Sequence, residues 1–534
     1  MSMLNHSLRY SFIGLCAGAL ALAASASLAS AEREGSAESP LATAASPLGS
    51  EPSTAVLRAP GAPAPTHAES KQPASEEPAS EEPASSGHPT SGPVFERVLD
   101  NGLKVLVKPD RRAPIVTSQV WYKVGSSYEH GGITGISHLL EHMMFKGTEN
   151  LAPGEFSRII AANGGDENAF TGRDYTAYFQ TLAADRLEIS FELEAERMRR
   201  LALPNDEFVK ELEVVKEERR LRTDDDPESL TFERFNATAY EASPYRIPVI
   251  GWASDLESIE VEDVRAWYRR WYAPNNATLV VVGDVEPDAV FALAEKHFGP
   301  LQPEPVVTPK PRTEPEQLGA KRLTVAAPAK EPYLLFGYKT PALRDLGADS
   351  DDAWEAYALE MLAAVLDDGA SSRFSRHLIR GRQVAAAVDA SYSAFGRLSG
   401  MLLFDGTPAK GKSIAELEQA MLAEIERLRA EPVSAEELER IRNGLVAGKI
   451  YEQDSVFYQA MLLGQLETVG LGWELADAYV THLAAVTPEQ IQAVANKYIR
   501  PENRTRAEMK PVPLDATDQR TAAAPVNGGL SHAD

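Results

Sequence analysis

Cysteine is almost absent from this chain of 534 residues, in which Cys16 is the only one. A single cysteine cannot close an intramolecular disulfide. Stability must therefore come from the burial of an apolar core, which a chain of this length can supply even in an oxidising compartment.

Positive charge is also scarce. The chain has 53 lysine and arginine residues against 78 aspartate and glutamate residues, which gives a formal net charge of -25 and a pI near 4.9. Nucleic acids demand basic patches for their phosphates, and an anionic membrane surface also attracts basic segments. The composition therefore argues against both partners, and acidity otherwise concerns solubility rather than activity.

A long hydrophobic run is missing as well. The apolar stretch nearest the start, residues 12–22, is too short to span a membrane. It comes after a short segment that carries Arg9 and leads to small residues at 29–31, which is the pattern of a secretory signal peptide. We therefore predict a signal peptide at 1–31 and a periplasmic or secreted protein without an integral membrane segment after cleavage.

Residues 32–92 have few aromatic or branched apolar side chains and consist mainly of Ala, Pro, Ser and Glu. The sequence Ala-Ser-Glu-Glu-Pro occurs twice in tandem, at 74–78 and 79–83. Such a segment cannot bury enough surface to offset its ordering entropy. We predict a disordered, semi-extended linker at 32–92 and a disordered tail at 513–534.

Folded sequence begins near Val94. Two alternating apolar and polar runs flank Asp100, Asn101 and Gly102, which predicts a β-hairpin. Residues 115–124 predict a further strand and 153–162 a helix, a strand comes next around 175–179, and helices dominate 186–222. The pattern indicates an α+β fold.

The chemistry is concentrated in His138-Leu-Leu-Glu141-His142. Side chains four residues apart lie on one face of a helix, so both imidazoles can turn toward one point, with Glu141 beside them. The order is inverted relative to the commoner H-E-x-x-H zinc motif. The alternative is a pair of core histidines, but the apolar flanks at 139–140 and 143–145 predict burial, and a buried glutamate would then need a partner. A metal site with an adjacent base fits better.

A catalytic zinc needs a third protein ligand and an open position for water. The segment that begins at Asn205, which we expect to cap its helix, offers several carboxylates. Glu218 has apolar neighbours one turn away at Val214, Val215 and Leu221, so we expect it to face inward. It is our candidate for the third ligand.

Glu211 lies seven residues before Glu218, on the same predicted stripe, and is placed to orient the site as a supporting acid. Glu217 and Glu213 have charged neighbours at the corresponding positions. We interpret those two as part of an ordinary solvated face.

Taken together, H-x-x-E-H and the later E-x-x-V-V-x-E-E helix resemble the M16 metallopeptidases, the relatives of pitrilysin, insulin-degrading enzyme and mitochondrial processing peptidase. The resemblance extends over roughly 95–511. It implies Zn²⁺ held by His138, His142 and Glu218, with Glu141 as general base and Glu211 as supporting acid.

The resemblance also covers two further segments. Asn168, Ala169 and Phe170 match the family's edge-strand segment, which pairs with the substrate backbone. Residues 224–227, Asp-Asp-Asp-Pro, also fit the family pattern after the ligand helix.

An internal repeat supports two related lobes. Residues 261–279 and 486–505 each show a helical pattern that leads through a Tyr-Pro turn toward a strand-like or terminal segment. We predict two homologous α/β lobes: a catalytic zinc domain at 93–300, an interlobe linker at 301–316 and a non-catalytic second domain at 317–512.

The predicted second lobe carries no metal motif. Its helix at 353–366 has no histidine, and the segment 371–380 resembles the family's Ser-Arg-Leu helix. Ala386 stands where many relatives have tyrosine, and we interpret His377 as structural. We identify no Arg/Tyr pair in this lobe that would support an oxyanion.

We expect an exported zinc metalloendopeptidase that hydrolyses unfolded peptides or oligopeptides with metal-activated water. Two alternatives stay open: a non-catalytic scaffold or assembly subunit, and a periplasmic peptide-binding module with a structural zinc. Glu141 speaks against both, because neither role needs a base. Because a lone pair of lobes would leave the zinc open to water, we also expect a homodimer or a heterodimer with a related subunit.

Overall fold

The computed structural model describes residues 92–306, 309–310 and 312–513. The predicted signal peptide, Cys16, residues 32–91 of the predicted linker and the tail from 514 lie outside the described residues. The boundaries of the predicted segments therefore stay predictions.

The first sheet has six strands in the order β1-β2-β6-β3-β5-β4. They are β1 Phe95–Val98, β2 Lys104–Pro109, β3 Ile115–Tyr122, β4 Asp166–Thr171, β5 Thr176–Ala183 and β6 Ala277–Gly283. The predicted hairpin is confirmed, because β1 and β2 pair antiparallel around Gly102, whose φ is 87°. Strand β6 runs parallel to β2 and antiparallel to β3, and β4 forms one edge.

The described residues of this half contain eight helices: α2 Ile136–Met143, α3 Glu155–Ala162, α4 Leu187–Arg199, α5 Asn205–Arg219, α6 Pro227–Ala239, α7 Ala253–Leu256, α8 Val261–Trp271 and α9 Pro287–His297. Of these, α6 packs against the second sheet. Alternate strand residues such as Val120, Leu279 and Val281 belong to the core that includes α2 and α8. Their neighbours Trp121, Val280 and Val282 belong to a separate cluster on the other face.

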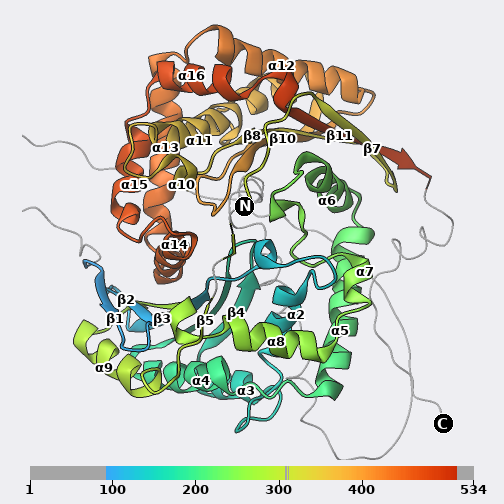
Figure 1. Cartoon of the computed structure of the whole chain (residues 1–534). Coiled ribbons are helices and arrows are strands. Elements are labelled where there is room, and N and C mark those ends of the chain that lie inside the picture. The colour runs from blue at the N-terminus through green and yellow to red at the C-terminus, as the bar shows by residue number, and fades with distance from the viewer. Residues whose placement is uncertain (1–91, 307–308, 311, 514–534) are drawn as a thin grey trace, which may run out of the picture. The chain divides into compact units, whose positions relative to one another are not determined.

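The second sheet has five strands in the order β7-β11-β8-β10-β9. Figure 1 labels β7, β8, β10 and β11 next to one another. The strands are β7 Lys321–Pro328, β8 Tyr333–Thr340, β9 Ala385–Ser391, β10 Gly400–Pro408 and β11 Arg504–Val512. The accompanying helices are α10 Leu343–Leu346, α11 Trp354–Asp367, α12 Ile414–Ala430, α13 Ala435–Glu452, α14 Val456–Val469, α15 Leu475–Ala484 and α16 Pro488–Tyr498. A π-helical turn occupies Ser375–Gly381.

The predicted internal repeat is confirmed in three dimensions. Helix α8 leads through the 3-10 turn Pro274–Asn276 into β6, and α16 leads through Pro501–Asn503 into β11. In each copy the asparagine side chain donates to a carbonyl near the end of the helix: Asn276 to Trp271 at 2.9 Å and Asn503 to Tyr498 at 3.1 Å. Strand β11 is parallel to β7, as β6 is to β2.

Helix α14 of the second half packs on the face of the first sheet that carries Trp121. Gly464 permits this packing, because a Cβ there would lie 2.2 Å from Trp121 Nε1. Trp121 Nε1 donates to Gln119 Oε1 at 2.9 Å, and Gln119 donates to the carbonyl of Phe457 at 3.2 Å. The two halves thus share a buried interface, which explains why every residue of β6 is buried.

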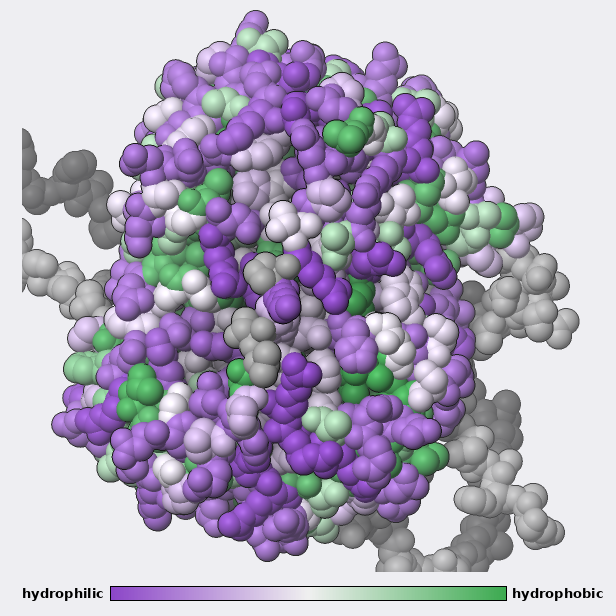
Figure 2. Space-filling view, viewed as in Figure 1, coloured by the Kyte–Doolittle hydropathy of each residue, from purple (hydrophilic) through white to green (hydrophobic). Residues whose placement is uncertain are grey.

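The surface agrees with the acidic composition. Hydrophilic residues predominate on the face shown in Figure 2, and the hydrophobic patches there are small. Among the described residues, no helix combines the length and apolar character needed to cross a membrane.

Gly464→Ala should destabilise the protein by about 1–3 kcal/mol, because Trp121 is fully buried and cannot yield space without moving its neighbours. The matched change Gly448→Ala, in α13, meets no atom within 4 Å and should stabilise by up to about 1 kcal/mol through helix propensity. Urea unfolding of the two variants beside the wild type measures both. Equal effects would contradict the packing described for α14.

Candidate metal centre

Helix α2 begins at a tight approach of two backbone segments. Gly135, at its N-cap, has φ of 90°, and a Cβ there would lie 2.6 Å from the carbonyl oxygen of Ile250. The Glu129 carboxylate accepts hydrogen bonds from the backbone N–H groups of Gly135 at 2.7 Å and Ser137 at 2.9 Å. These N–H groups have no partner within the helix, so the buried Glu129 fixes its start.

The predicted burial of α2 is largely confirmed. Leu139, Leu140 and Met143 are fully buried, whereas Phe145, beyond the helix end, is only partly buried. The side chains of His138 and His142 are 13% and 23% exposed. The apolar face thus anchors the helix in the core while the two imidazoles reach a site open to solvent.

Helix α5 differs from the sequence prediction in two details. Pro204 occupies the N-cap position and Asn205 is the first helical residue, without a side-chain cap hydrogen bond. Val215 is buried as expected, but Val214 and Leu221 are 48% and 56% exposed. The apolar neighbours of Glu218 were therefore weaker evidence than the periodicity suggested, because Glu218 lies at the border of the buried face.

The residues directly after Glu218 hold it in place. Arg219 is buried and forms a two-pronged ion pair with Glu233 of α6, at 2.7 and 3.1 Å. A π-helical turn, Arg220–Asp224, then continues the helix, and Arg222 in this turn reaches Glu218 Oε1 at 2.6 Å. Such local changes of helical winding are frequent at functional sites.

The structure brings the three predicted ligands together. Glu218 Oε2 lies 3.6 Å from His138 Nε2 and 3.5 Å from His142 Nε2. Ligands 2.0–2.1 Å from a tetrahedral zinc are separated by roughly 3.4 Å, so these distances fit such an ion. Among the described residues, this is the one group of His, Cys, Asp and Glu side chains found near enough to share a metal.

Glu211 contacts the His142 ring at Nδ1, the nitrogen that does not face Glu218, as expected for a supporting acid. Its Oε2 lies 3.3 Å from His142 Nδ1, and its Oε1 accepts from Lys146 Nζ at 2.7 Å. A carboxylate on Nδ1 fixes the ring and leaves Nε2 free to bind a metal. By contrast, Glu217 and Glu213 are 55% and 68% exposed and pair with Arg220 and Lys216, as expected for a solvated face.

The two imidazoles have opposite pKa shifts. Burial lowers the pKa of His138 to about 3, and its Nδ1 is a buried atom without a hydrogen-bond partner among the described residues. Burial opposes protonation of His142 too, but hydrogen bonds with Glu211 and Glu218 outweigh it and raise its pKa to about 9. The Glu218 pKa falls to about 2, since His142 and other nearby positive charges outweigh its burial. Zinc binds neutral imidazole and carboxylate, so a bound ion would displace the proton from His142.

Glu141 points toward the edge strand. Burial raises its pKa, and the hydroxyl of Thr171 donates to its Oε2 at 2.5 Å. Thr171 ends β4, directly after the predicted substrate residues, and sequence reasoning missed it. The one feature of the sequence that could have indicated it is the hydroxyl side chain at position 171, three residues after Asn168.

The predicted substrate segment lies in β4, which forms one edge of the sheet and, among the described residues, pairs with β5 alone. Asn168 Oδ1 accepts from the backbone N–H of Ala169 at 2.8 Å. Phe170 packs edge-on against Trp121, with ring centroids 5.3 Å apart. Its side chain therefore belongs to the apolar cluster on the far face of the sheet, while Thr171 contacts Glu141.

The second lobe helps to fix the turn after β4. Arg397 donates to Asp174 through its Nε at 3.2 Å and through its backbone N–H at 3.1 Å, and Ser127 donates to the same carboxylate at 2.7 Å. Elsewhere in that lobe, His377 pairs with the buried Glu424 at 2.9 Å, which fits the structural role expected for it.

Glu129 should make stability depend on pH. Burial raises its pKa from 4.5 to about 7, against the hydrogen bonds from Ser137 and Gly135. The folded protein thus keeps a proton that the unfolded chain loses near pH 4.5. The contribution of protonated Glu129 to the free energy of unfolding is therefore complete at low pH and is lost as the pH rises through 7. Its size is roughly 3 kcal/mol.

We therefore expect the unfolding free energy of wild type minus that of Glu129→Gln to fall between pH 4.5 and 7.5. Chemical denaturation across this range measures it. Glu439→Gln, at an exposed position in α13, is the matched control. A difference that stays constant with pH would contradict the titration of Glu129.

Two family models match the chain: "Insulinase (Peptidase family M16)" over residues 104–252 and "Peptidase M16 inactive domain" over 258–445. The "Zinc protease PqqE" of Helicobacter pylori is 32% identical over 417 residues, which cover 77% of this chain and 92% of that protein.

Solved structures give the same result. The crystal structure of a protease from Helicobacter pylori matches this chain with a TM-score of 0.74 and 31% identity, and the match covers 79% of this chain and 100% of that one. The periplasmic protease PqqL from Escherichia coli has a TM-score of 0.64 and covers 82% of this chain and 51% of that one, and its 17% identity shows a shared fold alone. With its two sheets, its internal repeat and a relative matched over nearly its whole length, the chain belongs to peptidase family M16.

Proposed function

We propose that this protein is a zinc-dependent endopeptidase that hydrolyses unfolded peptides. The observation that carries the proposal is the convergence of His138, His142 and Glu218 within 4.8 Å of one another, beside the half-buried Glu141, which is not one of the three. The zinc protease relative supports the choice of metal.

His138, His142 and Glu218 would hold the zinc, and Glu211 would keep the His142 ring oriented through Nδ1. Bound zinc supplies a Lewis acid and lowers the pKa of a coordinated water. The remaining steps belong to side chains of this chain.

Glu141 would act as the general base. It would take a proton from the attacking water and deliver it to the leaving amine. The Thr171 hydroxyl holds Glu141 Oε2 at 2.5 Å, so the second carboxylate oxygen is the one available for the proton. Burial of Glu141 raises its pKa, which makes it a better proton acceptor than an exposed glutamate.

The free edge of β4 would bind the substrate. An extended peptide beside Asn168, Ala169 and Phe170 would gain main-chain hydrogen bonds with little demand on its sequence. A folded substrate cannot present such a strand, so unfolded peptides or oligopeptides are the expected class. Export to the periplasm or beyond remains part of the proposal and rests on the pattern of residues 1–31.

The alternatives make different demands on the site. A structural zinc is normally enclosed by four protein ligands, whereas three candidate ligands converge here and Glu141 is tied to Thr171 instead. A scaffold or a peptide-binding module would need neither an open coordination position nor a base. The arrangement therefore favours catalysis over both.

Three variants test the function together. Glu141→Gln should keep its zinc and lose peptide cleavage by about 100-fold or more, because the amide keeps the shape but cannot accept the proton. Glu218→Gln should lose zinc as well as activity, because it removes a charged ligand. Glu217→Gln is the matched control and should change neither. Zinc per chain and cleavage of a quenched peptide are the measurements.

Near wild-type cleavage by Glu141→Gln would refute its role as the base. Equal zinc loss from Glu217→Gln and Glu218→Gln would refute the choice of Glu218 as ligand. A zinc-loaded wild type that cleaves no peptide would favour the scaffold or peptide-binding alternatives.

We propose as well that the protein works as a dimer, of identical chains or with a related subunit. The ligand side chains of His142 and Glu218 are still 23% and 17% exposed, and a second pair of lobes would shield them from water. Light scattering beside an activity assay should show a dimer that carries the activity. A fully active monomer at nanomolar concentration would refute this.

A further inference from the structure

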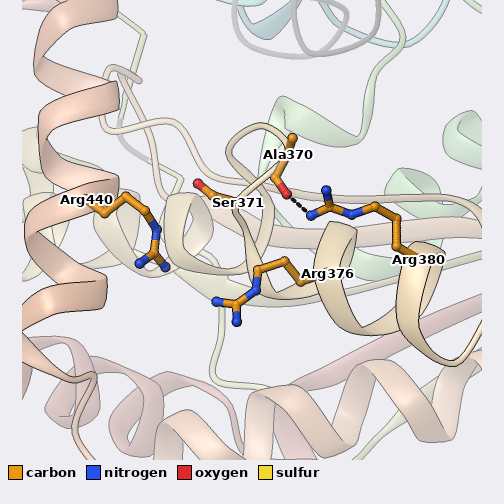
Figure 3. A pocket seen from close by; sticks show the side chains of 5 residues that line it. All are labelled: Ala370, Ser371, Arg376, Arg380 and Arg440. Atoms are coloured by element: carbon orange, nitrogen blue, oxygen red, sulfur yellow. Dashed lines mark hydrogen bonds between the residues drawn. The ribbon is translucent and has the colours of Figure 1, made fainter.

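A hollow of about 450 Å³ lies in the second lobe between the π-helical turn Ser375–Gly381 and helix α13. It is lined by Ala370, Ser371, Arg376, Arg380 and Arg440 (Figure 3). Arg376 and Arg380 come from the π-helical turn and Arg440 from α13. The Arg380 guanidinium turns to the Ala370 carbonyl, whereas those of Arg376 and Arg440 are directed away from that carbonyl. Within the described part of the chain, no acidic side chain lines it.

The ion pair between Arg373 and Glu437 fixes this arrangement. The two side chains form a two-pronged contact, at 3.0 and 2.8 Å, that ties the loop before the π-helical turn to α13. Arg376 and Arg440 each lie three residues after one of these partners. Both side chains therefore extend from the place where the π-helical turn meets α13, next to the partly buried ion pair of Arg373 and Glu437.

Arg380 is positioned by neutral groups. Its guanidinium donates to the carbonyl oxygens of Ala370 and Ser375. Carbonyl acceptors restrict the side chain but leave its full positive charge, so Arg380 is ordered without being neutralised.

The nearby carboxylates are already engaged by other cations. Glu437 pairs with Arg373, and Glu424 pairs with His377 and Arg427. Burial would raise the pKa of Glu437, but Arg373, Arg440 and Arg376 lower it. Arg376 and Arg440 also border an adjoining hollow of about 420 Å³, where these acids lie.

We propose that this hollow, the arginine pocket, binds a small multiply charged oxyanion, either a phosphate group or a dicarboxylate. Guanidinium groups match the planar and bidentate geometry of both. In a chain of net charge -25, these three arginines form no direct ion pair among the described residues, although Arg376 and Arg440 lie near Glu437 in the adjoining hollow. They are a local exception to the overall field. The proposal is independent of the peptidase function.

Isothermal titration of the full zinc-loaded protein with inorganic phosphate, and separately with succinate, tests the pocket at low ionic strength. The double variant Arg376→Gln/Arg440→Gln should raise the dissociation constant of the ligand that binds by about tenfold or more. Arg269→Gln, at an exposed position of α8 in the first lobe, removes the same type of charge and should leave binding unchanged.

The two titrants distinguish the sources. Tighter binding of phosphate assigns the pocket to phosphate groups, and tighter binding of succinate assigns it to dicarboxylates, provided that the double variant weakens it. The exposed positions of Arg376 and Arg440 should leave folding intact, which thermal unfolding checks. Binding that the double variant retains, as it would for an anion at the zinc, refutes the proposal, as does the absence of binding by either titrant at millimolar concentration.

Discussion

The imidazoles of His138 and His142 and the carboxylates of Glu141 and Glu218 lie together at the edge of a hydrophobic core. Much of the first lobe compensates for the free energy that their partial burial costs. Polar groups removed from water cost free energy unless each finds a partner. Glu211 provides such a partner for His142, Lys146 for Glu211, and Arg222 for Glu218. Thr171 provides one for Glu141. The Nδ1 atom of His138 is the exception.

This constraint explains why the site is assembled from segments far apart in the chain. Glu129 fixes the start of α2, and the buried pair of Arg219 and Glu233 fixes the end of α5. The second half adds α14 on the first sheet and the contact of Arg397 with Asp174 beyond β4. A half without metal ligands thus supports the strand that carries Thr171, which gives it a physical role in a site formed by the other half.

Sequence reasoning succeeded where the signal was local and periodic. The hairpin and the approach of His138 and His142 each result from spacings within a single segment, and the repeat from the same local pattern in two segments. Glu218 lies beside both histidines, although two of the neighbours used to infer its inward position, Val214 and Leu221, are exposed.

Glu129, Thr171 and Arg397 were not found in this way, because no periodic pattern relates each of them to its partner. Glu129 caps a helix across an intervening turn, which no capping-box spacing describes. The contact of Arg397 with Asp174 joins two lobes that are distant in sequence. The sequence prediction therefore missed polar side-chain contacts, and it also misplaced the cap and part of the buried face of α5.

The two lobes show how little of the chemistry lies in the fold. Helix α11 comes after β8 as α2 comes after β3, each before the remaining strands of its sheet. Yet α11 is filled with Ala, Leu and Met, and its half-buried Glu360 accepts a hydrogen bond from Tyr479 rather than being grouped with histidines. Equivalent scaffolds thus hold a candidate metal centre in one lobe and a packed core in the other, because the side chains at a few positions decide whether a buried helix needs a metal.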